Sequence, residues 1–100
     1  MPELRVLIAD DERMARERMA RLLEALGVQV VGLCPDGRAL LDELEVARVD
    51  AVFLDLEMPG LTGAEVADLI GPDGPLVVFA TAHRGPVSYT HLTLPTNREV

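Results

Sequence analysis

Hydrophobic residues along the first 80 positions fall into two kinds of stretch. Four short runs of mostly aliphatic residues occupy positions 6–9, 28–31, 51–54 and 76–80. Longer stretches between them mix apolar and charged residues. Short aliphatic runs of this kind are typical of strands that are buried on both faces of a sheet. We therefore expect four buried strands separated by amphipathic helices.

The clearest helical pattern covers residues 12–26. Its apolar positions follow a helical spacing that forms one stripe, and Gly27 ends the helix. The stripe consists of Ala15, Met19, Leu22, Leu23 and Leu26. The solvent face carries two pairs of opposite charge at i,i+4 spacing, Glu12 with Arg16 and Glu17 with Arg21.

Two more helices are expected further along the chain. A turn signal at residues 35–37 precedes a short helix with apolar residues at Leu40, Leu41 and Leu44. Thr62 and Glu65 have the spacing of a capping box, which would open a third helix. Strands alternating with helices indicate a parallel sheet with right-handed crossovers. The predicted fold class is α/β with a doubly wound parallel sheet.

Polar residues follow three of the four predicted strands. Asp10 and Asp11 follow the first, Asp55 the third and Thr81 the fourth. Ligands of open α/β sheets bind beyond the carboxyl ends of the strands, so we expect these side chains to converge there. Neighbouring carboxylates disfavour each other's ionisation, and a divalent cation such as Mg²⁺ relieves this repulsion. The pattern therefore predicts a magnesium site.

Each aspartate also has an ordinary structural interpretation. Aspartate is common where a strand turns into a loop, and Asp11 stands where the N-cap of the first helix is expected. These interpretations explain the residues singly. They explain less well why carboxylates follow strands that are expected to lie side by side.

The segments LIADDE, FLDLEMPGLTG and VVFATAH, in this order, resemble the receiver domain of two-component response regulators over about residues 3–84. The segment DERMARERM, with TAH after the fourth strand, is similar to the LytTR (AlgR/LytR-like) branch. The resemblance implies a flavodoxin/CheY-like fold and phosphorylation by a sensor histidine kinase. It also implies a receiver–receiver dimer in the full-length protein, and DNA binding only through an output domain that regulates transcription and is absent from this chain.

The resemblance assigns roles to individual residues. Asp55 matches the phosphoacceptor, and Asp10 and Asp11 match the acidic pair that holds Mg²⁺ together with Asp55. Glu57 would add its backbone carbonyl to the metal. The switch residues are Thr81 and Ala82, and the residues that shape the loop after the acceptor are Pro59 and Gly63.

The composition of the chain limits its expected binding partners and its expected location. The net charge of −8 argues against direct binding of nucleic acid by this chain. No apolar run has the length of a membrane span, so we expect no membrane contact. The single cysteine, Cys34, is expected to be a small core residue, and it fits a reducing, cytoplasmic location.

The C-terminal part of the sequence departs from the family pattern. Receivers carry a lysine after a fifth strand, and this sequence contains no lysine. Residues 1–86 lack Ser, Asn and Tyr, whereas residues 87–100 contain one of each and resemble a translated sequencing adapter. We expect a truncated receiver over 1–86, with four of five strands and without the last helix–strand–helix, followed by a non-native tail over 87–100.

Two alternative functions stay open at this stage. An aspartyl-nucleophile phosphohydrolase would place a second aspartate two residues after the nucleophile, where this chain has Glu57. A non-phosphorylated interaction fragment would fit the missing lysine. The favoured interpretation is a phosphoacceptor that gains and slowly loses a phosphoryl group, and not an enzyme of conventional turnover.

Overall fold

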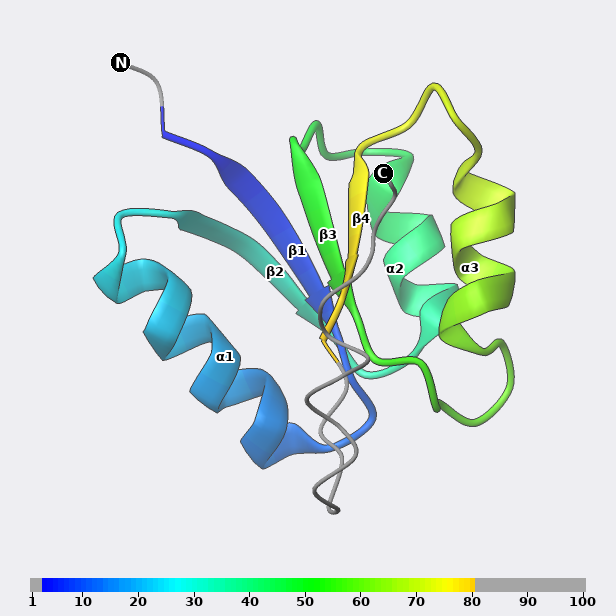
Figure 1. Ribbon diagram of the computed structural model, residues 1–100, viewed down its shortest axis with the longest axis horizontal. Coiled ribbons are helices and arrows are strands. Elements are labelled where there is room, and N and C mark those ends of the chain that lie inside the picture. The colour runs from blue at the N-terminus through cyan, green and yellow to red at the C-terminus, as the bar shows by residue number, and fades with distance from the viewer. Residues whose placement is uncertain (1–2, 81–100) are drawn as a thin grey trace, which may run out of the picture.

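The computed structural model describes residues 3–80 (Figure 1). Thr81, Ala82 and the predicted tail over 87–100 lie outside the described residues, so their predicted roles and the predicted domain boundary stay predictions. Strands and helices alternate along the described part. Their bounds are β1 (Arg5–Ala9), α1 (Arg13–Ala25), β2 (Gln29–Cys34), α2 (Gly37–Leu44), β3 (Ala51–Leu54), α3 (Gly63–Ile70) and β4 (Leu76–Phe79).

The described strands form one parallel sheet in the order β2-β1-β3-β4. This confirms the predicted α/β fold class with a doubly wound sheet. The register between β1 and β2 shifts between Val6 and Leu7, so that Leu7 pairs with Gly32 and Val31 is skipped. Beyond the regular ladder, the N–H of Asp55 donates to the carbonyl of Ala9 at 3.0 Å. The ends of β1 and β3 are thereby fixed next to each other.

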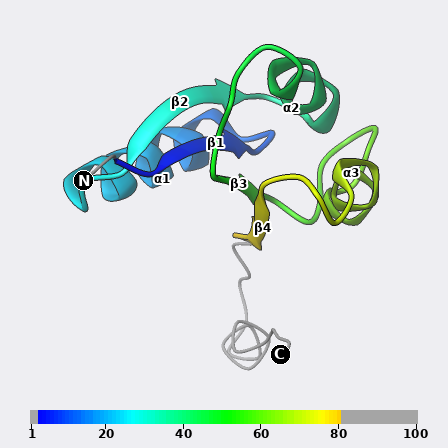
Figure 2. The same cartoon turned by 90° about the horizontal axis from the view of Figure 1, so that it is seen from above.

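Helices cover the two faces of the sheet unequally, with α1 on one face and α2 and α3 on the other (Figures 1 and 2). Successive residues of a strand point to opposite faces. Within β1, Leu7 and Ala9 therefore belong to the core under α2 and α3, whereas Val6 and Ile8 pack with Ala20 and Leu23 of α1. Burial on both faces explains why β1 is an uninterrupted apolar run.

Side chains close the starts of α2 and α3. The Asp36 carboxylate accepts the N–H of Ala39 at 2.8 Å. Thr62 accepts the N–H of Glu65 at 3.2 Å, and the Glu65 carboxylate accepts the N–H of Thr62 at 2.9 Å. The predicted capping box is confirmed, and it places the start of α3 directly after the loop that follows β3.

The predicted stripe on α1 is only partly buried. Leu23 is buried and Met19 packs beside it, but Leu22 is 57% exposed and Leu26 is 78% exposed. The side chains of adjacent helical residues point about 100° apart, and the sheet covers the side of α1 that carries Ala20 and Leu23 rather than the side that carries Leu22. Ala20 joins Leu23 in the core instead.

The charge pairs predicted on α1 were also wrong in detail. The ion pair among the described residues joins Arg13 and Glu17 at 3.0 Å, on the exposed side of the helix. Arg16 donates to the backbone carbonyl of Asp10 rather than pairing with Glu12. The first helix therefore contacts the end of β1 through a side chain that the sequence pattern assigned to solvent.

Cys34 ends β2 and is buried in the core, as predicted. Burial raises the pKa of its thiol to about 11, with smaller contributions from the nearby carboxylates. A thiol with such a pKa is protonated at neutral pH and unreactive. The cysteine is a packing residue.

Strand β4 pairs with β3 on one side and has no second neighbouring strand among residues 3–80. Its Leu76 is 67% exposed and its Phe79 is 39% exposed. An apolar edge of this kind is prone to pair with other chains.

Among the described helices, none is long and apolar enough to cross a membrane.

The difference between Leu40 and Leu22 gives a test of this core. Leu40 of α2 is fully buried, whereas Leu22 of α1 is largely exposed. Leu40→Ala should lower the free energy of unfolding by about 2–5 kcal/mol, because it leaves a cavity. Leu22→Ala should change it by about 0.5 kcal/mol or less. Urea unfolding of both variants measures this, and equal losses would contradict the observed placement of α1.

Candidate functional site

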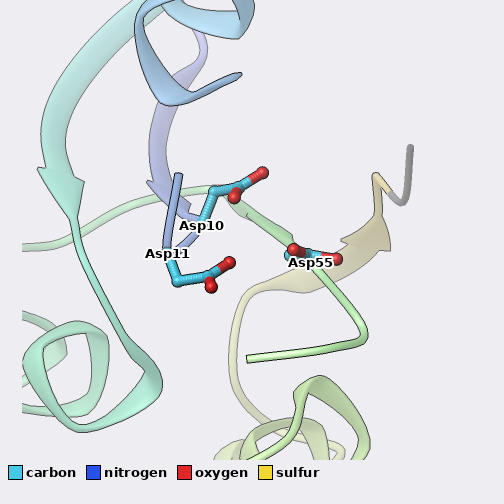
Figure 3. A group of neighbouring side chains, drawn as sticks. All are labelled: Asp10, Asp11 and Asp55. Atoms are coloured by element: carbon cyan, nitrogen blue, oxygen red, sulfur yellow. The ribbon is translucent and has the colours of Figure 1, made fainter. Parts of the chain in front are cut away.

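Three carboxylates meet where β1 and β3 end. Asp10 and Asp11 follow β1, and Asp55 follows β3. One carboxylate oxygen from each lies within 4.8 Å of the others. Figure 3 shows the three side chains directed into the same space. The structure thus brings together the aspartates whose convergence the sequence predicted.

The sheet order explains this convergence. From β1 the chain crosses over to β2 on one side and later to β3 on the other, so the order reverses between β1 and β3. The crevice at such a switch point is the usual ligand site of open α/β sheets. Asp10 is held there by its N–H, which donates to the Cys34 carbonyl at 3.1 Å.

Each of the two half-buried aspartates turns the chain that follows it. An oxygen of Asp10 accepts the N–H of Glu12 at 2.9 Å, and an oxygen of Asp55 accepts the N–H of Glu57 at 3.2 Å. These bonds, from a side chain to the backbone two residues on, form the turns typical of aspartate. The N-cap of α1 is Glu12, so Asp11 does not occupy the capping position that its ordinary interpretation required.

Burial and mutual repulsion both act on the acidity of this cluster. Burial is the largest cause that raises the pKa of Asp10, and the charges of Asp11 and Glu12 add to it. The pKa of Asp55 is raised by burial first and then by Asp10, Asp11 and Glu57. The N–H groups of Glu12 and Glu57 oppose these shifts without cancelling them. The ionised cluster is therefore unfavourable by itself.

The donor set fits a hard divalent cation. Carboxylate oxygens with some access to water are the ligands that Mg²⁺ prefers, and the cation removes the repulsion between them. Asp11 is exposed and Asp10 and Asp55 are half-buried, so water can complete the coordination. Glu57 follows in the same turn, on the exposed side.

Close packing fixes the loop that carries Asp55. A Cβ on Gly63, the first residue of α3, would lie 2.5 Å from the carbonyl oxygen of Asp55 and 2.9 Å from the Cα of Leu56. The N–H of Gly63 donates to the Leu56 carbonyl at 3.0 Å. Only glycine allows this approach. The start of α3 therefore lies directly against the backbone of Asp55 and Leu56.

Met58 anchors the same loop from within. It is 5% exposed and belongs to the core with Leu40 and Val66. Pro59 after it is exposed, and Gly60 has a φ of +81°, which turns the chain toward α3. The sequence carries no clear signal of this burial, because Met58 lies outside the predicted strands and helices and is followed directly by Pro59 and Gly60.

A groove of about 640 Å³ lies at the opposite end of the sheet, between the loop after α2 and the start of β4. One of its charged side chains, that of Asp50, accepts the N–H of Arg5, and the Arg5 side chain donates to the backbone carbonyl of Arg48. No polar side chain among the described residues is buried. Within residues 3–80, the group of carboxylates that could hold a cation is the one at the carboxyl ends of β1 and β3.

Comparison with known proteins assigns the family. The sequence model of the response regulator receiver domain matches residues 6–93. The chain belongs to the response regulator receiver family. An uncharacterized response regulatory protein of Yersinia pestis is 39% identical over 82 residues, which cover 80% of this chain and 34% of that protein.

Two further similarities support a receiver. The transcriptional regulatory protein BtsR of Escherichia coli K12 is 36% identical over 81 residues, covering 79% of this chain and 34% of BtsR. The receiver chain thus spans about a third of the length of the curated relatives it matches. The structure of response regulator TrrA from Thermotoga maritima, in complex with Mg²⁺ and BeF, has a TM-score of 0.75 at 30% identity and covers 89% of this chain and 76% of that one.

The contact under Gly63 gives the first test of the site. Gly63→Ala should lower the free energy of unfolding by about 1–3 kcal/mol, because the new methyl group overlaps backbone atoms that cannot move independently. It should also displace Asp55 and weaken cation binding. Thermal melts with and without Mg²⁺ measure both effects. A variant with unchanged stability and unchanged Mg²⁺ response would show that the contact is unimportant.

The raised pKa values give a second test, in metal-free buffer. The folded state binds the Asp10 proton more tightly than the unfolded state does, so stability falls as pH rises through the raised pKa. Asp10→Asn keeps the oxygen that accepts the Glu12 N–H but removes the charge. Its Tm at neutral pH should rise by about 2–5 °C, a gain kept small by partial exposure.

This gain should disappear below the ordinary pKa of aspartate, where the wild-type carboxyl is protonated in both states. Asp68→Asn, on the exposed surface of α3, is the matched control and should leave Tm unchanged at either pH. A gain that persists at low pH would contradict an electrostatic cause.

Proposed function

We propose that this receiver takes a phosphoryl group from the phosphohistidine of a sensor histidine kinase onto Asp55, with Mg²⁺ held by Asp10, Asp11 and Asp55. The observation that supports this most directly is the convergence of three carboxylate oxygens within 4.8 Å at the end of β1 and β3. The solved receiver TrrA, which carries Mg²⁺ and BeF, adds support from a relative of the same fold.

Asp55 is the nucleophile in this proposal. One of its oxygens forms a bond to phosphorus while the bond from phosphorus to the imidazole nitrogen breaks, and the product is an acyl phosphate on the carboxyl group. One oxygen of Asp55 accepts the Glu57 N–H, which orients the carboxylate. Phosphoryl transfer requires mainly positioning and charge neutralisation, and a bound Mg²⁺ supplies the neutralisation.

The neighbouring residues hold this arrangement. Asp10 and Asp11 are the cation ligands from β1, and Glu57 adds its backbone carbonyl. Gly63 and Pro59 shape the loop that presents Asp55. In the same proposal, Thr81 binds a phosphoryl oxygen as the switch residue and Ala82 leaves space beside it.

The relatives support a wider role for the full-length protein. BtsR is named a transcriptional regulatory protein, and this chain matches only about a third of it. We propose that the full-length regulator is cytoplasmic, belongs to the LytTR branch, and passes the signal to a DNA-binding output domain. A receiver–receiver dimer would then bring two output domains together on DNA.

Phosphorylation by a small donor tests the proposal. The chain is incubated with Mg²⁺ and acetyl phosphate and its intact mass is measured over time. We expect a single phosphoryl adduct that forms slowly, because the sequence has no lysine to contact the phosphoryl oxygens. The adduct should be absent in Asp55→Asn and without Mg²⁺, and present in the control Asp68→Asn.

Other results would favour the alternative functions. Rapid turnover of a phosphoester substrate would indicate an aspartyl-nucleophile phosphohydrolase. Absence of any adduct at saturating donor and Mg²⁺ would indicate an interaction domain that is not phosphorylated. An adduct that survives Asp55→Asn would place the acceptor elsewhere.

A further inference from the structure

Arg16 reaches from the first helix to the acidic site. It lies in the first half of α1, and its Nη1 donates to the backbone carbonyl of Asp10 at 2.8 Å, in a half-buried position. Its own N–H donates to the Glu12 carbonyl at 3.0 Å. The segment that joins β1 to α1 is therefore held by the Arg16 side chain as well as by the first backbone hydrogen bond of the helix.

This contact completes the fixation of Asp10. The N–H of Asp10 donates to the Cys34 carbonyl, its carboxylate accepts the Glu12 N–H, and its carbonyl accepts from Arg16. Backbone and side chain are thus held at three points. Because Asp11 is the next residue, the position of its backbone, from which the exposed carboxylate extends, is constrained by the same bonds.

The guanidinium contacts the backbone and not the acidic side chains. Among the described residues, Arg16 forms no ion pair within 4.0 Å with a carboxylate; the ion pair of α1 is Arg13 with Glu17. Its charge is still felt at the site, where it lowers the pKa of Asp10 as the smallest of several contributions. Arg16 therefore holds the backbone at Asp10 and leaves the carboxylates free of a direct ion pair with its guanidinium.

We propose that Arg16 is a positioning residue for the cation site, which orients Asp10 and Asp11 through the Asp10 carbonyl. This inference rests on the proposed function, in which the three aspartates bind Mg²⁺. The property that Arg16 would influence is the affinity of the three aspartates for Mg²⁺. Residues that orient metal ligands without touching the metal typically change metal affinity by about 10–100-fold when removed.

Two effects of removing Arg16 have opposite signs, which makes the inference testable. Loss of a positive charge near the site should strengthen the attraction of Mg²⁺, since like charges repel. Loss of the bond to the Asp10 carbonyl should loosen both ligands and weaken binding. If positioning dominates, affinity falls although the protein has become more negative.

The experiment measures the Kd for Mg²⁺ of the 100-residue chain by isothermal titration calorimetry. Arg16→Met keeps the length of the apolar stem and removes both charge and donors; its Kd should rise about tenfold. Arg18→Met, on an exposed position of the same helix, removes the same charge and should leave the Kd unchanged or slightly lower. Far-UV circular dichroism at each Mg²⁺ concentration shows that both variants are folded.

A third variant covers the case in which Arg16→Met does not fold. Arg16→Lys keeps the charge but has neither the reach nor the planar donors of the guanidinium, so its Kd should also rise, by less. An Arg16→Met or Arg16→Lys variant that binds Mg²⁺ as tightly as the wild type overturns the inference. A wild-type chain that does not bind Mg²⁺ at all overturns the proposed function instead, whatever the variants do.

Discussion

The mutual repulsion of three carboxylates at the ends of β1 and β3 is the constraint on which the site depends. The sheet order makes β1 and β3 neighbours, so the residues that follow them meet. Burial and repulsion both raise the pKa of Asp10 and of Asp55. A fold that brings these groups together must hold them by other contacts. The same arrangement creates a site where a divalent cation would relieve the repulsion between the carboxylates better than water does.

The contacts that hold the cluster are directed at the backbone. Cys34 and Arg16 bind the main chain of Asp10, and α3 begins against the main chain of Asp55 through Gly63. Met58 fixes the intervening loop from the core. Supports of this kind set the positions of the carboxylates without neutralising them. A side-chain partner such as a directly paired arginine would have satisfied the charge and reduced the need for a cation.

The order of strands and helices could be predicted because short aliphatic runs alternate with amphipathic stretches along this chain. The prediction that all four strands are buried was wrong for β2 and β4, whose Leu33, Leu76 and Phe79 are exposed at the edges of the described sheet. The aspartates could be predicted as a cluster because the carboxyl ends of parallel strands share one edge. The partner of Arg16 could not: i,i+4 spacing indicates Glu12, whereas the acceptor is a carbonyl that precedes the helix and has no side-chain signature. The burial of Met58 and the exposure of Leu22 were likewise set by tertiary packing that periodicity does not contain.

The ladder of hydrogen bonds gives a route by which a change at Asp55 can reach the fourth strand. The N–H of Ala80 donates at 2.7 Å to the carbonyl of Leu54, the residue directly before Asp55. A shift of the Asp55 backbone must therefore move the end of β4 or break this bond. Thr81 follows Ala80 in the sequence, and the family resemblance assigns the switch to that position. If Asp55 accepts a phosphoryl group as proposed, this bond connects the backbone before Asp55 to the strand end that leads into the predicted switch. The weakly covered edge of β4 offers little packing to resist such a movement.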